Sequence, residues 1–125
     1  MPNVALVLVT FNRSNLLREM LESAVNQTVL PNIIYVVDNN STDDTYKIVS
    51  NISAQYSETI KIVYHNTGTN LGGAGGFEFG SRLAYDAGHE WIWLADDDVE
   101  LAPDCLEHLL NHINDEEAKI RWIVQ

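Results

Sequence analysis

Three consecutive aspartates, Asp96, Asp97 and Asp98, follow directly after the apolar segment WIWLA. In an extended chain, side chains two residues apart point to the same side, so we expect Asp96 and Asp98 to face one ligand and Asp97 to face elsewhere. Two carboxylates aimed at one point repel each other unless one is protonated or a divalent cation lies between them. Oxygen ligands of this kind suit Mg²⁺ or Mn²⁺. The spacing therefore favours a cation site that could hold a diphosphate, although an acidic triplet alone is equally typical of a solvated strand end.

Two other polar segments follow apolar runs earlier in the chain. VALVLV at residues 4–9 precedes TFNR, in which Arg13 is the only cation, and IIYVVD at residues 33–38 ends in Asp38. Continuous runs of this composition are typical of strands covered on both faces. Loops after parallel strands meet at one edge of the sheet, where open α/β sheets bind ligands. We therefore expect Arg13 and Asp38 to lie near the aspartates.

The rest of the chain alternates apolar runs with segments of helical periodicity. Apolar residues at three- and four-residue spacing predict helices after Ser14 and after Ser41, which we expect to cap them, with Asp43 and Asp44 in the first turn of the second. This alternation predicts one α/β domain, a Rossmann-like, mostly parallel sheet flanked by helices. The predicted strands cover residues 4–9, 33–38, 60–65, 91–96 and a last strand, cut short, in 120–125.

The segment NTGTNLGGAGGFEFG is rich in glycine. It does not match the dinucleotide-binding fingerprint, because the third glycine position after Gly73 and Gly75 holds Glu78, and it lacks the Lys-Ser or Lys-Thr ending of a P-loop. Two interpretations remain. The segment is a flexible loop before a helix that ends at Gly88, or its glycines allow a tight turn or a close approach of the backbone.

Composition excludes several classes of partner. Seven basic against eighteen acidic residues give a formal charge of −11, which opposes binding to nucleic acid or to anionic membranes. No apolar run approaches the roughly 20 residues that span a bilayer, and the chain starts without a basic leader, so we expect a soluble, unexported protein. The single Cys105 favours a reduced compartment, the cytoplasm. His108 and His112 lack the glutamate of a zinc-protease motif, and we expect them to be exposed helix residues.

The segments VALVLVTFNR, VVDNNSTDDT, NLGGAGGF and WIWLADDDVELAPDCLEHLL resemble, in order and spacing, family two glycosyltransferases of the GT-A fold, over essentially the whole chain. The resemblance implies a nucleotide-sugar donor, a UDP- or dTDP-sugar, lying across these loops. Thr10 and Arg13 would then lie near the base or phosphates, and Asp38 would hydrogen-bond the base. Asp96 would approach the ribose, and Asp98 would hold Mg²⁺ or Mn²⁺ against the diphosphate with help from Asp96.

Asp96 and Asp98 are thus the expected catalytic and metal-holding carboxylates. The resemblance also implies inverting transfer to a glycan or lipid-linked acceptor, and the glycine segment is similar to members that transfer rhamnosyl or galactofuranosyl units in cell-envelope assembly. Such a protein would work in the cytoplasm or at the cytoplasmic face of the membrane. The residues that we expect to bind the donor are Thr10, Asn12, Arg13, Asp38, Asn40, Asn70, Gly72, Gly73, Asp96 and Asp97.

The chain departs from this family in one respect. Members carry an acidic general base, an acceptor site and more sheet in a following half, whereas this sequence stops at Gln125. We therefore expect residues 1–125 to be the nucleotide-sugar-binding part of a GT-A domain, without the acceptor-binding half and the catalytic base.

Three other functions are compatible with parts of the sequence. A catalytically silent nucleotide-sugar binder would share the same residues. A haloacid-dehalogenase-like phosphatase would use Asp96 as nucleophile and Asp98 as acid/base, but it places Thr or Val where this chain has Glu100, and here the motif comes after three strands. A receiver-like phosphoacceptor module needs an acidic pair after the first strand, where TFNR has none.

Overall fold

The structure is a computed structural model that describes residues 2–113 and 121–124. Strands and helices alternate along the chain, as the apolar pattern predicts. The elements are β1 (Val4–Thr10), α1 (Ser14–Val25), β2 (Ile33–Asp38), α2 (Thr45–Gln55), β3 (Lys61–Asn66), α3 (Gly72–Asp86), β4 (Trp91–Asp96), α4 (Cys105–Asn111) and β5 (Arg121–Val124).

The strands form one five-stranded sheet in the order β3-β2-β1-β4-β5, and every neighbouring pair is parallel. The predicted α/β fold class with a parallel sheet is therefore confirmed. The register brings the carboxyl ends of the strands level, with Thr10 opposite Asp38 and Val9 opposite Asp96. The segments after β1, β2 and β4 consequently open at the same edge.

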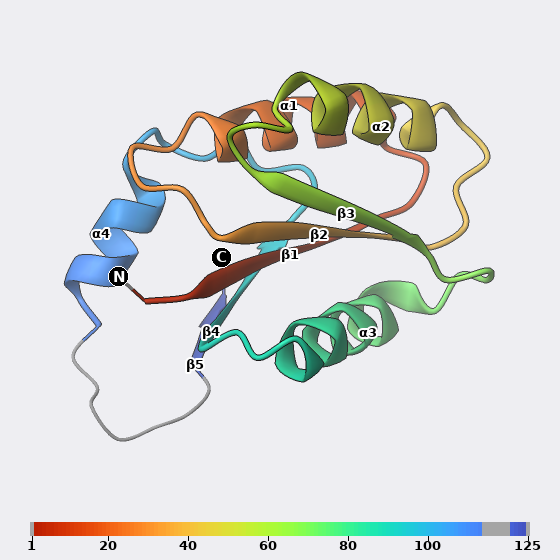
Figure 1. The fold of residues 1–125 in the computed structure, drawn as a ribbon. Helices are drawn as coiled ribbons and strands as arrows, with labels where there is room; N and C mark the ends of the chain where they lie inside the picture. Colours follow the sequence, from red (N-terminus) through yellow and green to blue (C-terminus); the bar gives the residue numbers. More distant parts are fainter. Residues whose placement is uncertain (1, 114–120, 125) are drawn as a thin grey trace.

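Helices cover both faces of the sheet (Figure 1). Val4, Leu6 and Leu8 of β1 are buried in the larger core with α1, α2 and part of α4, whereas Ala5 and Val7 are buried in a smaller core with α3. Successive strand residues point to opposite faces, so a strand covered on both must be apolar at every position. This explains why VALVLV has no polar alternation.

The glycine-rich segment is not a flexible loop, because α3 begins at Gly72. Gly76 and Gly80 lie on the buried face of this helix. A Cβ atom on Gly76 would lie 2.5 Å from Cγ1 of Val9, and one on Gly80 would lie 2.9 Å from Cγ2 of Val37. The close-approach interpretation is the correct one in this half of the segment, and the surface approached is the sheet.

The two predicted serine caps are wrong. Ser14 is the first residue of α1, and Arg13 holds the N-cap position. The Arg13 side chain makes no capping hydrogen bond to the helix. The Ser14 amide instead donates to Oδ2 of Asp43 at 3.2 Å. α2 begins only at Thr45, so Asp43 and Asp44 precede its first turn. The carboxylate that binds the start of α1 comes from another loop, 29 positions away in the chain. Local sequence patterns cannot predict such a distant partner.

In the part of the chain that the structure describes, no helix is both long and apolar enough to cross a bilayer.

Candidate functional site

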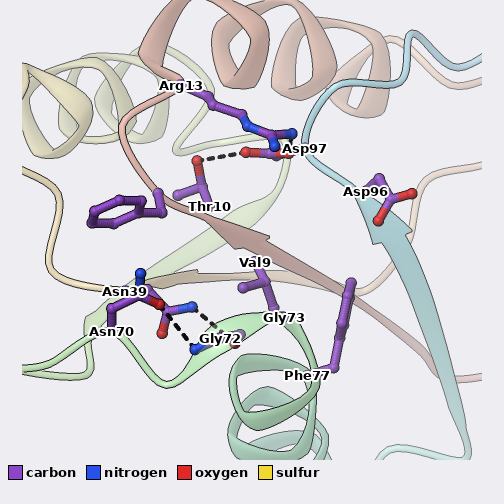
Figure 2. A pocket seen from close by; sticks show the side chains of 11 residues that line it. Val9, Thr10, Arg13, Asn39, Asn70, Gly72, Gly73, Phe77, Asp96 and Asp97 are labelled. Atoms are coloured by element: carbon purple, nitrogen blue, oxygen red, sulfur yellow. Dashed lines mark hydrogen bonds and ion pairs between the residues drawn. The ribbon is translucent and has the colours of Figure 1, made fainter.

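A cavity of about 360 Å³ lies at the carboxyl edge of the sheet, between the segments that follow β1 and β4. The chain runs from β1 outward to β2 and β3 and then returns to β4 on the other side of β1. The connections from β1 and β4 thus diverge and leave a crevice, as is usual in open α/β sheets. Figure 2 shows the lining, which consists of Val9, Thr10, Phe11, Arg13, Asn39, Asn70, Gly72, Gly73, Phe77, Asp96 and Asp97.

The cavity collects part of the predicted donor site. Four predicted residues lie outside its lining, namely Asn12, Asp38, Asn40 and Asp98. The lining also contains four residues that were not predicted to bind the donor, namely Val9, Phe11, Asn39 and Phe77. The predicted residues that line it are Thr10, Arg13, Asn70, Gly72, Gly73, Asp96 and Asp97.

Asp97 does not face away from the site, as the alternation of an extended chain predicted. Its carboxylate is buried and accepts hydrogen bonds from Thr10 Oγ1 at 2.9 Å and from Arg13 Nη1 at 3.3 Å. The reason is that β4 ends at Asp96, and Asp97 and Asp98 lie in a turn where the side chains no longer alternate. The middle aspartate therefore ties the β4 end to the first loop, residues 11–13.

The electrostatics of Asp97 reflect this position. Burial raises the pKa of its carboxyl, while the hydrogen bond from Thr10 and the charge of Arg13 act in the opposite direction and only partly compensate. Arg13 also approaches Oδ2 of Asp98, at 3.5 Å. A half-exposed guanidinium thus bridges a buried carboxylate and an exposed one.

Asp96 and Asp98 differ in surroundings. Asp96 ends β4, is exposed, and lines the cavity, and Figure 2 shows it apart from the Thr10–Asp97 pair. Asp98 is exposed and lies outside the cavity lining, and its ion-pair partner among residues 2–113 and 121–124 is Arg13. Among the described residues, no group of three or more His, Cys, Asp or Glu side chains converges to hold a metal ion.

Asp38 is buried one strand away. Its Oδ1 accepts from the amide and hydroxyl of Ser41 at 2.9 and 2.6 Å, and its Oδ2 accepts from the hydroxyl of Tyr64 at 2.6 Å. Burial, followed by this bond to Asp38, raises the pKa of Tyr64 to about 12. Asp38 is buried and already accepts three hydrogen bonds within the chain, so its expected contact with a base remains a prediction.

Asn39 is the buried residue that joins the second loop, residues 39–44, to the start of α3. Its Nδ2 donates to the carbonyl of Gly72 at 3.1 Å, and its Oδ1 accepts from the Leu71 amide at 3.3 Å. Asn70 Oδ1 accepts from the Gly72 amide at 2.9 Å. Asn39 directly follows Asp38 at the end of β2, so its place at a strand end was the signal in the sequence that could have identified it.

Asn12 and Asn40 shape the loops. Both adopt positive φ angles, of 51° and 69°, a conformation that asparagine tolerates better than most residues. The Asn12 amide donates to Ser41 Oγ at 2.9 Å, and Asn12 Oδ1 accepts from the Thr42 amide at 2.8 Å. Asn12 thus clasps the first loop to the second.

The similarity of the chain to known proteins decides its family. Residues 5–123 match the family model described as glycosyl transferase family 2. The chain belongs to this family. Membership confirms the resemblance seen in the strand-end motifs and decides against the phosphatase and receiver hypotheses.

Several curated glycosyltransferases are similar to this chain. The galactofuranosyltransferase GlfT1 of Mycolicibacterium smegmatis is 38% identical over 95 residues, which cover 76% of this chain and 30% of that protein. The GalNAc(5)-diNAcBac-PP-undecaprenol beta-1,3-glucosyltransferase of Campylobacter jejuni is 32% identical over 120 residues, which cover 96% and 37%. The chain therefore spans about a third of the length of such relatives.

Solved structures of glycosyltransferases share the GT-A fold of this family member. The mannosyltransferase PcManGT of Pyrobaculum calidifontis, solved with GDP-Man and Mn²⁺, superposes with a TM-score of 0.78 at 24% identity over 91% of this chain and 33% of that one. TarS 1–349 of S. aureus, solved with UDP-GlcNAc, gives a TM-score of 0.70 at 24% identity, over 87% and 30%. At this level of identity the comparison shows the fold.

Proposed function

We propose that the complete protein is an inverting, metal-dependent glycosyltransferase that moves a sugar from a UDP- or dTDP-sugar to a glycan or lipid-linked acceptor, and that residues 1–125 are its nucleotide-sugar-binding part. The observation that carries this proposal is the cavity between β1 and β4, which has Asp96 and Asp97 on one side and the start of α3 on the other. A cavity at this point of an open sheet is where a nucleotide ligand is expected.

The lining suits the parts of such a donor. Phe11 is 41% exposed at the cavity wall and offers a ring face on which a base can stack. Gly72 and Gly73 open α3, whose positive dipole end favours a diphosphate, although the Gly72 amide already donates to Asn70 Oδ1. Arg13 adds a permanent positive charge that can pair with phosphate oxygens. These groups offset the repulsion between the aspartates and an anionic ligand.

The aspartates suit a divalent cation of the hard type. Asp96 and Asp98 are exposed and supply only oxygen ligands, and the described residues add no third acidic, His or Cys ligand. This incomplete set matches Mg²⁺ or Mn²⁺, which keep several waters and bind substrate phosphates besides one or two carboxylates. When bound, such an ion stabilises the negative charge that grows on the departing nucleoside diphosphate. Asp98 would hold it, with Asp96 assisting.

The acceptor is proposed from the relatives. The matched galactofuranosyltransferases support a galactofuranosyl- or rhamnosyl-type donor. The glucosyltransferase named for a PP-undecaprenol glycan supports a lipid-linked acceptor. A role in cell-envelope glycan synthesis at the cytoplasmic face of a membrane is therefore part of the proposal. Because these relatives are about three times as long as the matched region, the acceptor site and the acidic base are assigned to the remainder of the protein.

Calorimetric titration tests the donor site. UDP or dTDP is expected to bind in the presence of MnCl₂ and to lose at least about tenfold in affinity without it or in Asp98→Ala. Asp86→Ala is the matched control, since it removes an exposed carboxylate at the far end of α3. Binding that needs no metal and is unchanged in Asp98→Ala would count against the proposal. Tight binding without sugar transfer by the longer protein would instead favour a silent binder.

A further inference from the structure

Arg13 already occupies the place where a cation would sit between the aspartates. In the described part of the chain, both ion pairs of the triplet Asp96–Asp98 are made by this residue. Its Nη1 lies 3.3 Å from Oδ1 of Asp97 and 3.5 Å from Oδ2 of Asp98. One guanidinium nitrogen therefore lies within ion-pair distance of two neighbouring carboxylates.

The two pairs differ in how firmly they are held. The Asp97 side chain is 7% exposed and is also bound by Thr10, whereas the Asp98 side chain is 47% exposed and has no such second partner among the described residues. Exposed ion pairs are weak and exchange readily with solvent ions. The contact between Arg13 and Asp98 is thus the one that can open while the contact with Asp97 persists.

A divalent ion on Asp98 and the guanidinium of Arg13 would compete for the same carboxylate, whose Oδ2 lies 3.5 Å from Arg13 Nη1. Two positive charges within a few ångströms also repel each other even in a well-solvated site. The competition is relieved when an anionic group binds nearby and forms an ion pair with the guanidinium of Arg13. A diphosphate at the cavity provides that group, since Arg13 lines the cavity wall.

We propose that Arg13 is a built-in competitor of the divalent cation at Asp98, and that it passes from Asp98 to the donor diphosphate when the cation binds. This inference rests on the proposed function, because it takes Asp98 as the carboxylate that holds the cation. It makes Arg13 a residue that links the two ligands. Cation and nucleotide then each bind more tightly in the presence of the other, and Arg13 supplies part of that coupling.

Binding of Mn²⁺ alone, followed by electron paramagnetic resonance of the free ion, tests the competition. Arg13→Gln is expected to bind Mn²⁺ about fivefold more tightly than the unmodified protein, and the gain should vanish in the double variant with Asp98→Asn. Arg82→Gln is the matched control, because it removes the same charge from an exposed pair with Glu78 on α3. This control should stay within about twofold.

Three outcomes would overturn the inference: a gain in Arg13→Gln no larger than in Arg82→Gln, a gain that survives without Asp98, or an absence of saturable Mn²⁺ binding in every variant. Circular dichroism of each variant shows that the fold is retained.

A second arm titrates UDP at saturating Mn²⁺, where Arg13→Gln should bind more weakly than Arg82→Gln. Failure of UDP to bind the unmodified protein would contradict the proposed function, whereas intact UDP binding without the Mn²⁺ gain would contradict only the competition.

Discussion

Two buried aspartates at the same edge of the sheet are held in different ways. Asp38 receives three hydrogen bonds, all from uncharged donors of Ser41 and Tyr64. Asp97 receives one from the hydroxyl of Thr10 and one from the half-exposed guanidinium of Arg13. The carboxylate of Asp38 is thus satisfied by neutral donors, neither of which forms an ion pair with another residue in the described part of the chain. The second depends on a charged partner that it shares with Asp98, so its region can respond to ligands.

The largest expected effect comes from removing the better satisfied of the two. Asp38→Ala leaves two hydroxyls and one amide, which belong to the partly buried residues Ser41 and Tyr64, without their acceptor, and we expect a loss of about 3 kcal/mol in the free energy of unfolding. Urea denaturation at neutral pH measures it. The control Asp86→Ala should change stability by no more than about 0.5 kcal/mol. A change in Asp38→Ala as small as that of the control would show that the hydrogen bonds of Asp38 do not stabilise the fold.

Asp97→Ala should have a smaller effect, of about 1 kcal/mol. The substitution strands the buried hydroxyl of Thr10, but Arg13 can turn to water, and removing the carboxylate relieves the unfavourable burial of its charge. The same urea experiment, run beside Asp38→Ala, ranks the two sites. If Asp97→Ala proves the more destabilising variant, the view that Asp38 is the better satisfied of the two carboxylates is wrong.

The smallest effect concerns pH. In the second loop, burial raises the pKa of Asp43, but hydrogen bonds from Thr45 and Ser14 outweigh it, so the pKa lies below the ordinary 3.8. Its contribution to stability is present above pH 3.8 and is lost as the pH falls through the folded-state value. The raised pKa of Asp97 acts in the opposite sense, because the folded protein then holds its proton more firmly, and stability falls as the pH rises above 3.8.

Unfolding free energies from pH 3 to pH 7 separate these contributions. Asp43→Asn should reduce the loss of stability on acidification, whereas Asp97→Asn should remove an opposing contribution and steepen that loss. Two variants with the same slope as the unmodified protein would contradict both assignments.

Much of the architecture could be predicted from local patterns. The runs 4–9, 33–38 and 91–96 are apolar at nearly every position, and each is a central or near-central strand of the parallel sheet. Helical spacing of apolar residues correctly placed α1 and α2. The positions of polar groups at strand ends then brought Thr10, Arg13 and Asp96 to one cavity. These predictions succeeded because periodicity and burial are properties of neighbouring residues.

Side-chain directions at the strand ends were less predictable. Asp97 was expected to face away, and it faces Thr10 because the chain turns after Asp96. Asp43, not Ser14, satisfies the start of α1. The three carboxylates also differ in their surroundings, which depend on the tertiary structure. Asp38 is bound by Ser41 and Tyr64, Asp97 is buried beside Thr10 and Arg13, and Asp98 is half-exposed.

The amino-acid pattern alone was enough to establish an α/β domain, its strand positions, its acidic character and the motifs of its family. Only the folded arrangement decided which aspartate is buried, which one shares Arg13, and where the glycines of α3 meet the sheet. The physical reason is that periodicity is written within a few residues, whereas the partner of a carboxylate can be far away in the chain. Thr10 and Asp97 are separated by 87 positions, and no local pattern relates them.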